Sequence, residues 1–170
     1  MYSNIIAGIT RIKSPTSSTT YGYAMKDLNS DGINELILLD SNYVIVAIFT
    51  EVDGKAILVD TYNEWHTAWI DRNGLIHVQD YVFPGFSKDR IYSLYTIQNG
   101  NLISTLTVGY DYGGNKDNSK WYKLVNGDRT DLSKEDWDKL YAEWALDIGD
   151  TKSYDYTKEN ANLDYVEISN

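Results

Sequence analysis

Side chains that carry oxygen recur at every second position of a short polar stretch, at Asp27, Asn29 and Asp31. Gly32 follows directly and permits the sharp turn that a tight loop needs. Calcium takes about six to eight oxygen ligands in flexible geometry, and alternate side chains of such a loop can converge on one ion. The spacing therefore predicts a calcium-binding loop.

Two later residues would complete the ligand set of this loop. Ile33 can contribute its backbone carbonyl, and Glu35 offers another carboxylate. The twelfth position, which is a bidentate Glu in an EF-hand, is Leu38 here, inside an apolar run typical of a strand. We therefore expect a loop between two strands and not an EF-hand. The predicted calcium ligands are Asp27, Asn29, Asp31, Ile33 and Glu35.

This stretch resembles the calcium loop of FG-GAP repeats and related VCBS-like domains, in which Asp-x-Asp/Asn-x-Asp-Gly-x-x-Asp/Glu joins two strands. The residues that fit the motif are Asp27, Asn29, Asp31, Gly32 and Glu35. The resemblance covers residues 21–62 and implies that the loop binds calcium between neighbouring strands of one sheet. FG-GAP repeats come in series, whereas this chain has one clear copy.

A wider resemblance links residues 21–39 and 125–140 to domains of secreted or lipoprotein-type proteins from Gram-positive gut bacteria. Most of those domains have no assigned activity, so the resemblance implies a location and a fold. It favours a non-enzymatic accessory domain that is extracellular or attached to the cell surface. The partners expected there are a calcium ion and a glycan or protein of the surface.

A turn without metal is the alternative for the loop. Asn, Asp, Ser and Gly form turns on their own because their side chains bond to nearby backbone groups. Against this alternative, three carboxylates lie within nine residues, and without a cation they would repel one another.

The composition argues against some classes of partner and some kinds of chemistry. The chain of 170 residues has a formal net charge of -10, which disfavours nucleic acid and anionic membranes but suits a cation. It has no cysteine, so disulfides and thiolate chemistry are excluded. We find no signal peptide and no apolar run of about 18 residues that could span a bilayer.

The rest of the sequence predicts an α+β fold that is mostly β. Four turn dipeptides, each between apolar runs, indicate an antiparallel β-meander of about eight to ten strands, either a curved sheet like a propeller blade or a small sandwich. These dipeptides are Asp53-Gly54, Asn73-Gly74, Asn99-Gly100 and Asn126-Gly127. The expected units are an N-terminal helix and linker (1–19), a β-rich domain that ends in a helix (20–149) and a polar tail (150–170).

Each end of the β-rich region should carry a helix packed on a sheet. Isoleucines recur at helical spacing in residues 2–13. Ser133 has the place of an N-cap, and an apolar stripe that includes Trp137 and Trp144 follows it up to Gly149. The tail beyond should contribute at most a last edge strand.

Carbohydrate binding is the first alternative function, because sugar rings stack on exposed aromatic side chains. The candidate residues are Trp65, Trp69, Tyr110 and Tyr112. Aromatic residues also pack well within sheets, so a structural role explains them equally.

A hydrolase is the second alternative, with weaker support. The chain has two histidines, and His77 alternates with apolar neighbours, which predicts that it faces solvent. No nucleophile motif accompanies either histidine. The stretch 111–119, with Asp111, Asn115 and Asp117, could hold a second cation, but its irregular spacing favours a surface loop.

Overall fold

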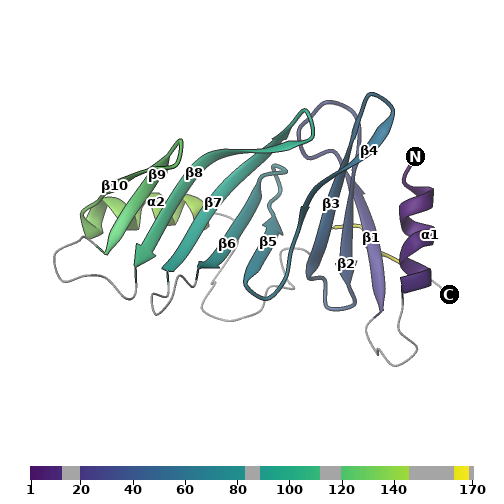
Figure 1. Cartoon of the computed structure of the whole chain (residues 1–170), viewed down its shortest axis with the longest axis horizontal. Coiled ribbons are helices and arrows are strands. Elements are labelled where there is room, and N and C mark those ends of the chain that lie inside the picture. The colour runs from purple at the N-terminus through teal and green to yellow at the C-terminus, as the bar shows by residue number, and fades with distance from the viewer. Residues whose placement is uncertain (13–19, 83–88, 112–119, 146–162, 169–170) are drawn as a thin grey trace.

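The strands form two antiparallel sheets, which confirms the prediction of a mostly β fold with antiparallel neighbours (Figure 1). The computed structural model describes residues 1–12, 20–82, 89–111, 120–145 and 163–168. The five-stranded sheet has the order β11-β1-β2-β3-β4, with β1 Tyr21–Lys26, β2 Glu35–Asp40, β3 Ile45–Val52, β4 Lys55–Thr61 and β11 Val166–Glu167. The six-stranded sheet has the order β10-β9-β8-β7-β6-β5, with β5 His66–Ile70, β6 Ile76–Val82, β7 Asp89–Gln98, β8 Asn101–Asp111, β9 Trp121–Val125 and β10 Asp128–Asp131. The helices are α1 Ser3–Ile12 and α2 Lys134–Ala145.

All four predicted turn dipeptides join neighbouring antiparallel strands. At Asn99-Gly100 both residues have positive φ, 50° and 78°, as a type I′ hairpin turn requires. The tail contributes β11 as an edge strand beside β1, as expected. In the larger sheet, β10 is an edge strand, and all four of its residues are exposed.

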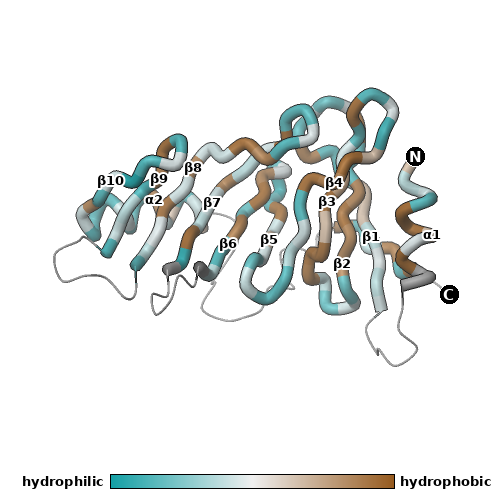
Figure 2. Tube along the Cα trace, in the orientation of Figure 1, coloured by the Kyte–Doolittle hydropathy of each residue, from teal (hydrophilic) through white to brown (hydrophobic). Residues whose placement is uncertain are grey.

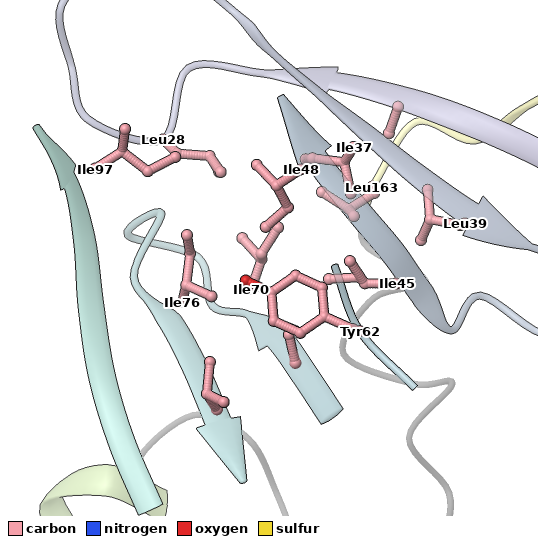
Figure 3. Packing of buried hydrophobic residues seen from close by; sticks show 13 residues of the cluster. Leu28, Ile37, Leu39, Ile45, Ile48, Tyr62, Ile70, Ile76, Ile97 and Leu163 are labelled. Atoms are coloured by element: carbon pink, nitrogen blue, oxygen red, sulfur yellow. The ribbon is translucent and has the colours of Figure 1, made fainter. Parts of the chain in front are cut away.

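The main core lies between the two sheets and takes isoleucines from both (Figure 3). Ile37 and Ile48 come from the smaller sheet, and Ile70 and Ile76 come from the larger one. Figure 2 shows that the most hydrophobic strands, β2 and β3, lie in the smaller sheet. Each of the four isoleucines is at most 3% exposed, so this interface is the principal hydrophobic contribution to stability.

Helix α1 covers the other face of the smaller sheet. Ile5 and Ile9 pack with Leu36 and Leu38, whereas Ile37 faces the core between the sheets. Successive side chains of β2 therefore enter two different cores, and five consecutive residues of this strand are buried. Burial on both faces is typical of a strand whose apolar residues do not alternate with polar ones.

Helix α2 covers the outer face of the larger sheet. Ser133 caps it, with its Oγ accepting a hydrogen bond from the backbone N of Asp136 at 3.1 Å. Trp144 is fully buried, and its Nε1 donates to the carbonyl of Ser93 at 3.0 Å. Of the two helices in the described ranges, neither is long and apolar enough to cross a membrane.

The prediction that His77 faces solvent is wrong, because α2 covers the face on which it lies. The side chain is 1% exposed, and its Nδ1 lies 2.6 Å from the carbonyl oxygen of Trp144. A carbonyl only accepts, so Nδ1 carries a proton. The Nε2 atom lies 3.2 Å from a carboxylate oxygen of Asp71.

A second histidine, His66, joins the two sheets. Its Nδ1 bonds to the carboxylate of Asp80 on β6, and its Nε2 lies 3.0 Å from that of Asp60 on β4. The imidazole also stacks on Tyr62, with 4.9 Å between ring centroids. Hydrogen bonds to Asp80 and then to Asp60 raise the pKa of His66 to about 9, against the opposing effect of burial.

This link makes stability depend on pH in a defined window. Because the folded pKa is above the unfolded value of 6.5, the stabilisation is complete below about pH 6.5 and declines as pH rises to about 9. We expect the free energy of unfolding, measured by urea titration, to fall by about 1–3 kcal/mol across that window. In His66→Gln the decline should disappear, and an unchanged slope would refute the assignment.

A close contact between β8 and β9 gives a second stability test. Gly109 lies opposite Tyr122, and a methyl group at Gly109 would overlap the tyrosine ring. We expect Gly109→Ala to lower the free energy of unfolding by about 1–3 kcal/mol in chemical denaturation. The matched control is Gly8→Ala in α1, where nothing lies within 4 Å of the new methyl and helix propensity should add up to about 1 kcal/mol. Equal effects of the two changes would contradict this interpretation.

Candidate functional site

The predicted calcium loop connects β1 to β2 in the smaller sheet. The strands are paired up to Lys26 and Glu35, so the intervening residues form the whole connection. Leu28 is 4% exposed and enters the core between the sheets, where Figure 3 shows it beside Ile97. This anchor holds the loop against the fold, while Asp31 on the same loop is exposed.

Inside the loop, the side chains of positions 27, 29 and 31 fold over one turn of backbone. One carboxylate oxygen of Asp27 and the amide oxygen of Asn29 both accept from the backbone N of Asp31, each at 3.2 Å. The other oxygen of Asp27 accepts from the backbone N of Gly32 at 2.9 Å. Oδ1 of Asp31 accepts from the backbone N of Ile33 at 2.8 Å, and its Oδ2 accepts from Nδ2 of Asn29 at 2.9 Å.

These contacts bring the three predicted side-chain ligands together without using all their acceptor capacity. A carboxylate has about four lone-pair positions, so oxygens that accept one backbone hydrogen bond can also bind a cation. The same hydrogen bonds satisfy a metal-free Asx turn, which is the alternative stated above. The geometry is therefore that of a closed loop, and these hydrogen bonds fit both interpretations.

Glu35, at the end of the loop, is buried, whereas Asp31 is exposed. Glu35 is fully buried, with Oε2 accepting from the backbone N of Leu28 and Oε1 from Oγ1 of Thr50, both at 2.8 Å. Burial raises the pKa of this carboxyl, and the charge of Asp31 adds to the increase, although both hydrogen bonds oppose it. Sequence reasoning did not identify Thr50, which lies 15 positions away on β3.

In the part of the chain that the structure describes, no three His, Cys, Asp or Glu side chains are grouped so that they could hold a metal ion. The acidic residues of the loop therefore do not converge as a set of three. Asp27 and Asp31 remain together with Asn29.

The loop also contacts the other sheet, at the β5–β6 turn. Nζ of Lys26 donates to the carbonyl of Asp71 at 3.0 Å. A methyl group on Gly74, whose φ is 85°, would lie 2.6 Å from the carbonyl oxygen of Leu28. Only glycine fits this approach, so the loop and the turn are packed backbone to backbone. No sequence pattern links these two segments.

The aromatic candidates are not one surface. Trp69 is 1% exposed and meets Trp144 of α2 edge-on at 5.9 Å, so its prediction as a sugar platform is wrong. It alternates on β5 with residues of the inter-sheet core and therefore faces the helix. Tyr110 is partly buried beside Trp137 at 6.3 Å, and Tyr112 lies outside the described residues.

Trp65 is the predicted aromatic residue that remains accessible, at 51% exposure. It lines a pocket of about 540 Å³ together with two aromatic residues that sequence reasoning missed, Tyr62 and Tyr81. The rings of Trp65 and Tyr81 meet edge to face at 6.1 Å. Tyr81 comes from β6, and only the pairing of the strands brings it to Trp65.

Two carboxylates away from the calcium loop do approach each other, as a hydrolase would need. They belong to Asp60 and Asp80, but the imidazole of His66 lies between them and bonds to both. The pair therefore holds an imidazole and does not flank a substrate position. Asn115 and Asp117 of the possible second cation loop lie outside the described residues.

Comparisons of the chain with protein-family models, with curated proteins and with solved structures gave no significant match. The resemblance to FG-GAP repeats therefore rests on the loop residues alone and stays a prediction. What the protein does has to be inferred from the geometry of the loop and of the pocket.

Proposed function

We propose that the protein is a non-enzymatic accessory domain of the cell surface or extracellular space, with a structural calcium ion in the loop between β1 and β2. The ligands are side-chain oxygens of Asp27, Asn29 and Asp31 and the backbone carbonyl of Ile33. The observation that carries this proposal is the shared donor: oxygens of Asp27 and Asn29 both bond to the backbone N of Asp31. They therefore lie on one side of a single turn, as ligands of one ion must.

Electrostatics favours a cation at this position. Two carboxylates, those of Asp27 and Asp31, share one short loop, and a third, that of Glu35 at the end of the loop, is buried. A divalent cation would offset their mutual repulsion, which is strongest for the carboxylate that water does not screen. The net charge of -10 raises the cation concentration around the whole protein.

The proposed role of the ion is structural. It would fix the loop that sets the register of β1 against β2 and that contacts the β5–β6 turn through Lys26. Weak extracellular calcium sites fill at concentrations of about 10⁻⁴–10⁻³ M, which suits a surface location. We assign Glu35 to anchoring the loop through Leu28, while its direct ligation of calcium and the likeness of the sheets to a propeller blade stay predictions.

Calcium should stabilise the folded protein. At a free concentration about 100 times the Kd, binding to the folded state alone adds about 2.7 kcal/mol, or roughly 5–10 °C in Tm for a chain of this size. Differential scanning calorimetry in EDTA and in millimolar calcium measures the shift, and isothermal titration calorimetry gives the Kd. Coincident melting curves together with no heat of binding would refute the proposal.

The matched variants are Asp27→Asn/Asp31→Asn and Asp53→Asn. The first pair removes the charges of both proposed aspartate ligands and should abolish the shift in Tm. Asp53 lies in the β3–β4 hairpin turn with a φ of 51°, which Asn also tolerates, so this control should keep the full shift.

Glu35→Gln separates anchoring from ligation. As an anchor, the residue loses one charged acceptor in a buried position, and we expect the free energy of unfolding in EDTA to fall by about 1–3 kcal/mol. The calcium Kd of the folded variant should change by less than about threefold, because the four proposed ligands are intact. A loss of affinity of about tenfold or more at unchanged stability would instead make Glu35 a ligand.

A further inference from the structure

The pocket beside Trp65 lies where the two sheets meet, at the end away from the calcium loop. Its apolar lining includes Val44, just before β3, Val46 on β3, and Tyr62, just after β4. Glu64, whose side chain is exposed, lies at its rim. In the register of β2 and β3, Leu39 pairs with Ile45 near this end, whereas Leu36 pairs with Phe49 at the loop end. The volume of about 540 Å³ is within the range of small-ligand sites.

The backbone of Trp65 is fixed by hydrogen bonds at both its N and its carbonyl, and the indole ring contacts Tyr81. The backbone N of Trp65 donates to the side-chain oxygen of Asn63 at 2.8 Å, and its carbonyl accepts from the backbone N of Tyr81 at 2.8 Å. The ring meets Tyr81 at an interplanar angle of 81°. A side chain on a fixed backbone, with its ring already against another ring, has less conformational entropy to lose when a ligand stacks on it.

The charges around the pocket select against ionic ligands. Glu64 on the rim and Asp60 behind Tyr62 disfavour anions. The same carboxylates attract cations, but Tyr62 and Tyr81 each already have a cationic neighbour, which opposes that attraction. The guanidinium of Arg90 lies 5.1 Å from the centroid of the Tyr81 ring, and the imidazole of His66 stacks on Tyr62. His66 is positively charged at neutral pH because Asp80 and Asp60 raise its pKa to about 9.

A neutral ligand that fits must have an apolar face for the indole and polar groups for the rim. A sugar ring has both, since its C–H face stacks on aromatic rings and its hydroxyls donate to carboxylates. We propose that this pocket binds a neutral sugar residue of a glycan, stacked on Trp65 and hydrogen-bonded to Glu64. This site is independent of the calcium loop. Of the four aromatic residues predicted from the sequence to bind a glycan, it includes Trp65 alone.

The test uses the full chain on an array of neutral gluco-, galacto-, manno- and xylo-oligosaccharides, with sulfated glycans, polyuronic acids and choline as charged probes. We expect at least one neutral class to bind and the charged probes not to bind. Isothermal titration calorimetry with the best neutral oligosaccharide then gives the Kd for each variant. Binding of charged probes alone, or of no neutral glycan, would overturn the proposal.

The variants decide whether the binding is at this pocket. Trp65→Ala should weaken binding at least about tenfold, whereas Trp65→Tyr, which keeps an aromatic face, should stay within about threefold. Glu64→Gln, a change at an exposed side chain, should weaken binding several-fold in a protein whose circular dichroism is unchanged. Val125→Ala, at a side chain that is 52% exposed outside the pocket lining, is the matched control and should leave the Kd unchanged. Neutral-glycan binding that Glu64→Gln and a folded Trp65→Ala both leave intact would place the site elsewhere.

Discussion

Burial of both faces of β2 is the constraint on which the rest of the structure depends. Ile37 and Leu39 face the core between the sheets, and Leu36 and Leu38 face α1. A strand without a solvent face cannot shift its register without moving every side chain into the wrong core. Its first residue is the carboxylate Glu35, so the same strand that organises two hydrophobic cores also fixes the position of the loop.

This arrangement connects hydrophobic packing to the chemistry of the loop. A buried carboxylate is costly unless it is hydrogen-bonded, and Glu35 obtains its two donors from Leu28 and Thr50. The bond to Leu28 closes the loop, and the side chain of Leu28 enters the core beside the larger sheet. The loop is therefore positioned by buried groups, while its side-chain oxygens are held by hydrogen bonds to the backbone of the loop itself.

Local patterns in the sequence predicted local structure well. The turn dipeptides, the cap at Ser133 and the apolar run of β2 depend on neighbouring residues, so residue types along the chain show them directly. His77 and Trp69 show where this reasoning stops. Alternation indicates that two faces exist, but it does not show that a helix from the other end of the chain covers the second face.

The same limit applies to the candidate sites. Spacing along the chain identified Asp27, Asn29 and Asp31, which the loop brings together. It could not identify Thr50 beside Glu35 or Tyr81 beside Trp65, because strand pairing alone creates these contacts. It also could not show that Glu35 is buried and accepts hydrogen bonds from Leu28 and Thr50, because that burial depends on the elements that pack around it.

The exposed strand β10 has a consequence for how the protein meets other copies of itself. Three of its four residues are charged, namely Asp128, Arg129 and Asp131, and the guanidinium of Arg129 bonds to Asp131 and lies over the ring of Tyr122. Another strand that added to this margin would have to place its backbone among these charges and compete with their contacts. The charges on β10 therefore disfavour the addition of a strand from another copy at this edge of the larger sheet.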